Sequence, residues 1–212
     1  VHAEKNDRNS IWKAMKNRNV YATSGEKIKL NFQLRYQGSI FPMGSELSIN
    51  TNPQFHIWAK GAQIQRPGCP TNHPLSKTKQ QKLCGGECFN PSGKFKKIKK
   101  FEIIKITPRL YKNEYIGDLI HDPWKILKCN KVECKYTFQD DNFLTHNRPS
   151  IYYVRVIQEK SQIINGNGII CENNKCSKIS LCTGGFETDD NNDCLGSASQ
   201  RAWSSPIYLN KK

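Results

Sequence analysis

Motifs that mark several common enzyme classes are missing from this chain of 212 residues. It has no G-x-S-x-G nucleophile elbow, no phosphate-binding P-loop and no G-x-G-x-x-G dinucleotide-binding motif. None of its five histidines stands in an H-x-H or H-E-x-x-H pattern. The residues give no sign of an α/β-hydrolase, a nucleotide-binding enzyme or a zincin. We therefore expect no catalytic residue and no cofactor in this chain.

Long apolar runs are also missing. No stretch approaches the roughly 20 apolar residues that a membrane-spanning helix needs, and hydrophobic residues make up 36% of the chain. A chain of this length can still bury a core without help from metals or disulfides. Its first residue is Val1 rather than a methionine, and no apolar leader follows. We therefore expect a processed protein or a piece of a longer one.

Basic residues are in large excess. The net charge is +15, from 33 Lys and Arg against 18 Asp and Glu. One interpretation is a binding site for a polyanion such as nucleic acid, anionic lipid or an acidic glycan. The interpretation that we favour is a solvated strand edge, because lysines at an edge block pairing between sheets. The densest basic patch consists of Lys94, Lys96, Lys97, Lys99, Lys100 and Lys105.

Nine cysteines are many for a chain of this size. They indicate an oxidising compartment, either the periplasm or the exterior of the cell. The pairing of Cys69, Cys84 and Cys88 stays open. The odd count leaves one thiol free, or bound to another chain or to a segment missing from this one, and a zinc ribbon that adds His73 is the alternative. Three other pairs lie close together in polar loops and are expected to form disulfides: Cys129 with Cys134, Cys171 with Cys176, and Cys182 with Cys194.

Alternation of apolar and polar residues predicts most of the strands. It is strict in residues 28–36 and recurs in 55–60 and 151–158, and apolar residues also mark strands at 20–23, 96–107, 134–138 and 203–209. Residues 61–93 and 160–200 are polar, carry cysteines and are expected to be long loops. Residues 122–124, Asp-Pro-Trp, are expected to begin a turn or one helical turn. The predicted fold class is mainly β: an antiparallel β-sandwich with long, disulfide-stapled loops.

One helix is expected in front of the sandwich, over residues 8–17. Its apolar residues recur at helical spacing, so they form a stripe that the rest of the chain need not cover. We therefore mark Ile11, Trp12 and Met15 as a possible interface. Trp58 is a further candidate, because it falls on the polar face of its strand.

The two ends of the chain carry the most specific motifs. Residues 8–25 read R-N-S-I-W-K-A-M-K-N-R-N-V-Y-A-T-S-G, and residues 201–207 read R-A-W-S-S-P-I. Shorter matching segments lie at 42–44, 101–106, 122–124 and 152–158 and at the last four cysteines. As a set, these segments resemble the C-terminal region of a bacterial exported protein family of unassigned function. The N-terminal part of that family is similar to the PHP (polymerase and histidinol phosphatase) metallohydrolase barrel.

This resemblance implies that residues 1–25 are a junction segment, whose helix is left over from a missing α/β barrel, and that residues 26–212 are the sandwich domain. It implies a non-catalytic C-terminal domain that covers the barrel or binds a partner in a phosphoesterase-like protein. The divalent metals would belong to the missing barrel, with His2 and Glu4 near that site. The alternative is a free-standing extracellular binding or assembly subunit, such as a fibre or surface protein, whose partner is another copy of the chain.

Residues 187–193 are rich in hard oxygen ligands. Asp189, Asp190 and Asp193 could hold Ca²⁺, because carboxylate oxygens are its usual ligands. The stretch lacks the spacing and the glycine of an EF-hand loop, so we favour a solvated acidic loop.

Overall fold

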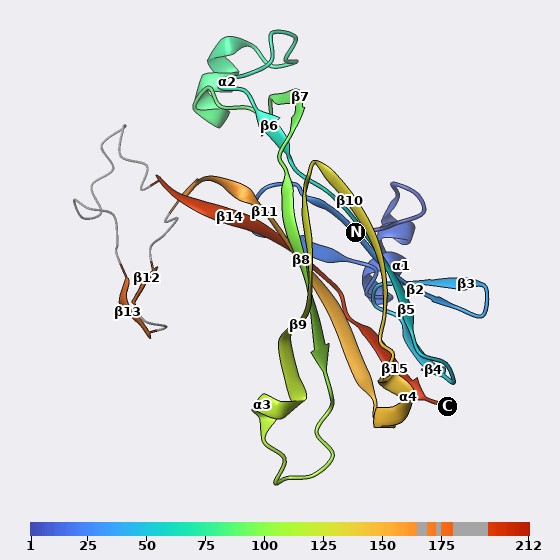
Figure 1. Ribbon diagram of the computed structural model, residues 1–212. Coiled ribbons are helices and arrows are strands. Elements are labelled where there is room, and N and C mark those ends of the chain that lie inside the picture. Colours follow the sequence, from blue (N-terminus) through green and yellow to red (C-terminus); the bar gives the residue numbers. More distant parts are fainter. Residues whose placement is uncertain (165–168, 173–174, 180–194) are drawn as a thin grey trace.

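The chain is built mainly from β-strands, as its alternating residues predict (Figure 1). The computed structural model describes the backbone of residues 1–164, 169–172, 175–179 and 195–212. Its helices are α1 (Arg8–Lys16), α2 (Lys77–Cys84), α3 (Ile116–Leu119) and α4 (Phe143–His146). No helix in these ranges is long and apolar enough to cross a membrane.

Two larger sheets organise the described strands. The seven-stranded sheet contains β1 (Tyr21–Thr23), β4 (Glu46–Ile49), β8 (Ile98–Ile106), β9 (Ile120–Lys131), β11 (Ser150–Ile164), β14 (Leu195–Ser204) and β15 (Ile207–Lys211). The four-stranded sheet has the spatial order β10 (Glu133–Gln139), β5 (Gln54–Lys60), β2 (Lys29–Tyr36) and β3 (Ser39–Pro42). Pairing is antiparallel except between β4 and β15. Two smaller sheets pair β6 (Gln63–Gln65) with β7 (Pro91–Phe95), and β12 (Ile169–Glu172) with β13 (Lys175–Ile179).

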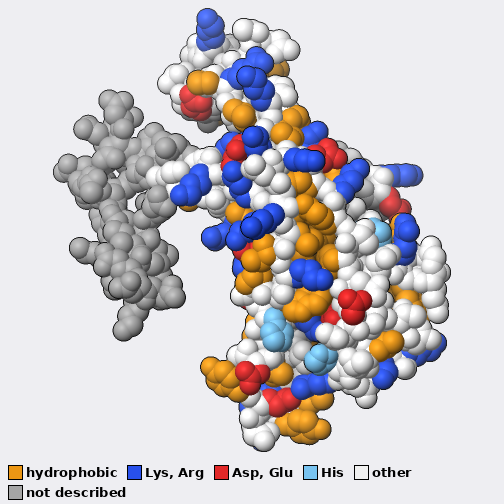
Figure 2. Space-filling model, viewed as in Figure 1, with side chains coloured by type: hydrophobic (Ala, Val, Ile, Leu, Met, Phe, Trp, Pro, Cys, Tyr) orange, Lys and Arg blue, Asp and Glu red, His pale blue; other side chains and the backbone are white. Residues whose placement is uncertain are grey.

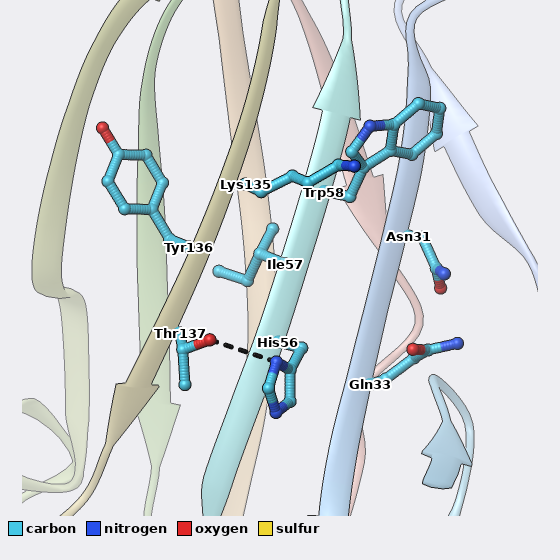
Figure 3. Close-up of a pocket in the computed structure, with 8 residues that line it drawn as sticks. All are labelled: Asn31, Gln33, His56, Ile57, Trp58, Lys135, Tyr136 and Thr137. Carbon is cyan, nitrogen blue, oxygen red and sulfur yellow. Dashed lines mark hydrogen bonds between the residues drawn. The ribbon is translucent and has the colours of Figure 1, made fainter.

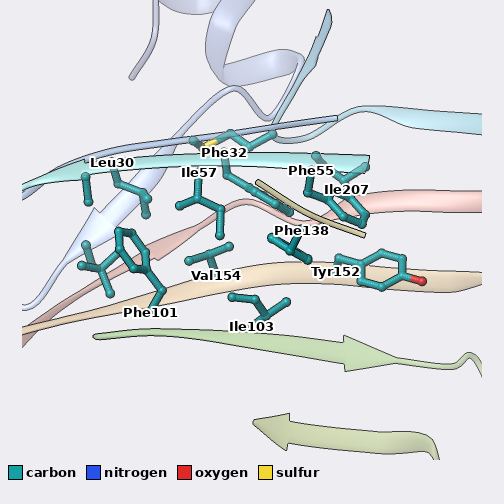
Figure 4. Packing of buried hydrophobic residues seen from close by; sticks show 14 of the residues in the cluster. Leu30, Phe32, Phe55, Ile57, Phe101, Ile103, Phe138, Tyr152, Val154 and Ile207 are labelled. Atoms are coloured by element: carbon teal, nitrogen blue, oxygen red, sulfur yellow. The ribbon is translucent and has the colours of Figure 1, made fainter. Parts of the chain in front are cut away.

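The hydrophobic core lies between the two larger sheets (Figure 4). Every second residue of β2 and β5 points into it, so Leu30, Phe32 and Phe55 are fully buried. The Phe55 ring lies 4.7 Å from that of Tyr152 on β11, across the interface between the sheets. Burying each such side chain stabilises the fold by about 1.5–3 kcal/mol. The predicted β-sandwich is therefore confirmed.

The strand β9 corrects the expectation of a turn at Asp122-Pro123-Trp124, because these residues lie inside a strand of 12 residues. A proline has no backbone N–H and is tolerated in a strand that lacks a neighbour on one side. Among the described strands, β9 pairs with β8 alone, so it is such an edge strand. The proline therefore marks the edge of the sheet and not the end of a strand.

Residues 61–93 are not the continuous loop that their composition predicts. They contain α2, which begins where the Ser76 hydroxyl accepts a hydrogen bond from the Lys79 N–H and ends at the left-handed Gly85. They also contain β6 and part of β7. Residues 160–200 likewise contain strand: β11 continues to Ile164 and β14 begins at Leu195. Strand pairing with distant residues extends these elements beyond what local composition indicates.

The N-terminal segment is attached to the sandwich. Strand β1 pairs with β14, with Ala22 opposite Trp203. Gly44, in the turn before β4, has a positive φ of 91°, and a Cβ there would lie 2.4 Å from the Arg18 carbonyl oxygen. Only a glycine allows the backbone after α1 to approach this closely.

Candidate functional site on the four-stranded sheet

The outer face of the four-stranded sheet carries a hollow of about 320 Å³, lined by polar side chains together with Ile57, Trp58 and Tyr136 (Figure 3). Strand register assembles it. His56 on β5 stands between Gln33 on β2 and Thr137 on β10, and Trp58 stands between Asn31 and Lys135. These residues alternate along each strand with the buried ones, because successive side chains of a strand point to opposite faces of the sheet. One set fills the core and the other forms this outer face.

Hydrogen bonds hold two of the side chains in place. Nδ1 of His56 lies 3.1 Å from the Thr137 hydroxyl, whereas its Nε2 is shielded from solvent and has no hydrogen-bond partner among the described residues. Partial burial, with a smaller contribution from the Arg35 charge, lowers the pKa of His56. The ring is therefore neutral at pH 7, with one donor and one acceptor nitrogen. The Trp58 indole donates a 2.7 Å hydrogen bond to Glu133.

The charge on this face is mainly positive. Lys29, Arg35, Lys60 and Lys135 occupy outward positions of β2, β5 and β10. Glu133 is the anionic residue among the outward positions of these three strands, and it already accepts the Trp58 hydrogen bond. The arrangement can bind a flat, polar, negatively charged group. Within the described ranges, no three His, Cys, Asp or Glu side chains are grouped so that they could hold a metal ion.

Trp58 was expected at an interface, and the structure places it in this hollow. The other lining residues were missed, because each is an ordinary polar residue on a solvent face. The signal that could have found them is the pairing of β5 with both β2 and β10, which puts four polar side chains beside Trp58 and His56. That pairing joins His56 to Gln33, 23 positions away, and to Thr137, 81 positions away, and alternation alone does not reveal it.

A larger hollow of about 700 Å³ lies between the 61–96 segment and the sandwich. Glu26 is the acidic residue among its lining side chains, beside Lys27, Lys29 and Lys96. Its carboxylate accepts hydrogen bonds from Lys96, Gln158 and Ser161. These partners already occupy the Glu26 carboxylate, which therefore has little hydrogen-bonding capacity left for a ligand. The contacts instead stabilise the attachment of the 61–96 segment to the sandwich.

The described residues contain two disulfides, one within the 61–93 segment and one that joins the neighbouring ends of β9 and β10. Cys129 is joined to Cys134, the pairing that their separation predicts, and Cys69 is joined to Cys88. Cys84 is half-buried and has no disulfide partner among the residues that the structure describes. These bonds are typical of an oxidising, non-cytoplasmic compartment.

The remaining disulfide predictions and the calcium prediction lie outside the described part of the chain. The structure does not describe Cys182, Cys194, Asp189, Asp190 and Asp193, nor the side chains of Cys171 and Cys176. The backbone positions of Cys171 and Cys176 are described, and they face each other in the β12–β13 hairpin.

The structure places His2 and Glu4 beside α1, where they line a hollow of about 210 Å³ with Lys13 and Ala14. Nε2 of His2 lies 2.9 Å from the Leu30 carbonyl oxygen. That contact ties the N-terminus to β2, so His2 has a structural role in this chain.

The helix α1 presents the apolar side chains that the sequence marked. Trp12 is 67% exposed and Met15 is 52% exposed, while Ile11 is half-buried and Ala14 is buried. Asp7 caps the helix by accepting a hydrogen bond from the Ser10 N–H. The helix therefore packs through Ala14 and leaves its largest apolar side chains to solvent.

The lysine patch is smaller than the sequence suggests. Lys105 does not belong to it, because this residue lies in the core and pairs with Asp140. Lys96 pairs with Glu26, and Lys100 lies 2.7 Å from Glu102. Basic side chains are scattered over the face shown in Figure 2 and are not gathered in one patch. The free positive charge of the cluster is therefore carried mainly by Lys94, Lys97 and Lys99.

Comparison with known proteins gives a family likeness for the first third of the chain. Neither the curated proteins nor the solved structures contain a match. Residues 1–67 match the family model described as "Protein of unknown function (DUF3604)". This range runs from α1 through β6 and includes Asn31, Gln33, His56 and Trp58 of the hollow, so the β2 and β5 side of the site lies within the part that is similar to an uncharacterised family.

Proposed function

We propose that this chain is a non-catalytic β-sandwich domain that binds a partner, and that it forms the C-terminal part of an exported, PHP-like protein of the metallo-phosphoesterase type. The observation that carries this proposal is the outer face of the four-stranded sheet, a polar hollow with a fixed tryptophan and an excess of positive charge. A neutral histidine, two amides and a tryptophan are binding groups, and none is an activated nucleophile.

Two further observations support the setting of the domain. The junction motif in residues 8–25 resembles the segment that follows the barrel of PHP-like proteins, and the family model covers the same residues. The disulfides agree with a periplasmic or extracellular location. The divalent metals and the reaction would belong to the barrel, and the sandwich would cover the barrel or bring a ligand to it.

A phosphoesterase assay tests the non-catalytic assignment. We expect the chain to show no turnover of a generic phosphate ester above the buffer rate in Mn²⁺, Zn²⁺ or Fe²⁺, since no metal-ligand group lies in its described residues. Turnover that needs a metal and survives the substitutions His2→Ala and Glu4→Gln would contradict the proposal.

The second candidate function is an extracellular assembly subunit, and the exposed side chains of Trp12 and Met15 favour it. An apolar face of this kind marks an interface. The barrel and a second copy of the chain are the two occupants to distinguish. A stable dimer or fibre of the isolated chain would favour assembly, and a monomer that binds its separately expressed N-terminal region would favour the first function.

A further inference from the structure

We propose that the hollow on the four-stranded sheet binds an acidic saccharide, one that carries a carboxylate on its sugar ring. The sugar ring would lie on Trp58, and its carboxylate would face Lys135. This inference rests on the proposed function in one respect: it assumes that the domain acts by binding. It adds the chemical class of the ligand and the residues that recognise it.

The tryptophan supplies a broad apolar surface beside the polar side chains of the hollow. The hydrogen bond from its indole to Glu133 holds the ring at one end of the site. In Figure 3, Trp58 and Lys135 lie together at one end, and His56 and Thr137 lie at the other. Side chains two residues apart on a strand are about 7 Å apart, so one sugar ring can contact both Trp58 and His56. The C–H face of a sugar packs on an indole, which has an apolar body and a polar edge.

The polar side chains match the hydroxyl groups of a sugar. Asn31 and Gln33 each carry an amide with both donors and an acceptor, and they line the hollow on the β2 side. Neighbouring hydroxyls of a sugar present the complementary pair of donor and acceptor. His56 adds a shielded nitrogen without a partner in the described part of the chain. A buried polar atom of this kind is costly until a ligand or water satisfies it.

The charge of the face indicates that the saccharide is acidic. Four cations occupy the outward positions of β2, β5 and β10, against one carboxylate that is already in use. The side chain of Lys135 is 75% exposed and lies 3.9 Å from Glu133, so it can turn toward a ligand carboxylate. A lysine ammonium is a compact charge on a flexible side chain, so it can pair with such a carboxylate.

The same features argue against a nucleic acid. Single-stranded nucleic acid is usually held by successive aromatic side chains, one for each stacked base. The hollow contains Trp58, and Tyr136 donates its hydroxyl hydrogen bond to the Lys128 carbonyl, away from the amides.

Isothermal titration calorimetry of the whole chain with oligogalacturonate tests the proposal. We expect binding of the acid form, and weaker binding of the fully methyl-esterified form and of oligothymidylate. Trp58→Ala should weaken binding by about tenfold or more, and Lys135→Gln by a smaller factor. Lys128→Gln, at an exposed position of β9, is the matched control and should leave the affinity unchanged.

A second variant guards against a folding defect in Trp58→Ala. The double substitution Asn31→Ala and Gln33→Ala leaves the tryptophan in place and should weaken binding by a similar factor. Absence of binding to oligogalacturonate, equal affinity for oligothymidylate, or full affinity in both folded variants would each overturn the proposal. If the chain also lacks phosphoester turnover, those outcomes reject the saccharide as the ligand. They do not contradict the proposal that the domain is non-catalytic.

Discussion

At the scale of single residues, the contact between Lys105 and Asp140 places a charge pair inside the core. Nζ of Lys105 lies 2.5 Å from the Asp140 carboxylate, and the two side chains are 8% and 2% exposed. The Tyr152 hydroxyl donates a 2.6 Å hydrogen bond to the same oxygen. Burial would raise the pKa of Asp140, but the hydrogen bonds from Lys105 and Tyr152 outweigh it and hold the pKa below its usual value.

We predict that Lys105→Met destabilises the chain by about 3–5 kcal/mol at neutral pH, because it leaves a buried carboxylate without its cation. A carboxyl with a depressed pKa stabilises the folded state above its unfolded pKa, and this contribution is lost as the pH falls below about 4. The penalty of the variant should therefore shrink in acid.

Urea unfolding over a range of pH measures this prediction. Lys135→Met is the control, because the side chain of Lys135 is exposed, and its loss should cost less than about 1 kcal/mol. A penalty that stays constant from neutral to acidic pH would mean that Asp140 does not carry the charge.

At the scale of elements, two disulfides restrict the connections between strands, and helix α1 leaves apolar side chains exposed. Cys129–Cys134 closes the connection between β9 and β10, and Cys69–Cys88 closes the connection that contains α2. The two bonds restrict loops that would otherwise be free in the unfolded chain. Each closed loop contributes about 2–3 kcal/mol in the chain-entropy account.

We predict that non-reducing peptide mapping recovers Cys69 linked to Cys88 and Cys129 linked to Cys134, with Cys84 alkylated by iodoacetamide. The same digest checks the two further pairs predicted from the sequence, Cys171 with Cys176 and Cys182 with Cys194. Recovery of the Cys69, Cys84 and Cys88 group with stoichiometric zinc would favour the zinc ribbon instead.

The helix α1 yields a second prediction at this scale. Replacing Trp12 and Met15 by glutamine should shift the melting temperature of the chain by less than about 3 °C, because both side chains are exposed. The same change should abolish any self-association seen by size-exclusion chromatography. A large loss of stability in the monomer would show instead that the helix belongs to the core of this domain.

At the scale of the whole molecule, the N-terminal segment and the sandwich are joined at a close backbone contact. The Gly44 N–H donates to the Pro206 carbonyl, and the Arg18 side chain donates to the Gly44 carbonyl. The contact thus connects the end of α1, the turn before β4 and the turn before β15. The helix is therefore held to the sandwich through the segment that follows it, which includes Arg18, rather than through its large apolar side chains.

We predict that Gly44→Ala destabilises the chain by more than about 1 kcal/mol and exposes the N-terminal segment to proteolysis, because the new Cβ meets the Arg18 carbonyl in a left-handed backbone. Gly38→Ala is the matched control, since Gly38 also has a positive φ but nothing lies within 4 Å of its Cβ position. Equal losses in the two variants would show that the backbone angle alone matters.

The sequence by itself determined the mainly β fold and the faces of its central strands. Alternation in residues 28–36 and 55–60 predicts which side chains are buried, because a strand turns successive residues to opposite faces. It also predicted the exposed stripe of α1 and the pairing of Cys129 with Cys134, because both depend on residues close together in the chain. The same alternation marked Trp58 as a candidate interface residue, because it places this large ring on the polar face of its strand.

The tertiary structure decided everything that depends on distant partners. Pro123 lies in a strand because β9 is at an edge of its sheet, and Lys105 is buried because Asp140 meets it across 35 positions of sequence. The polar hollow exists because β5 pairs with β2 on one side and β10 on the other, which brings Gln33 and Thr137 to His56. The alternation of residues along a strand predicts which face of the sheet a side chain lies on. The pairing of strands determines which other side chains it contacts.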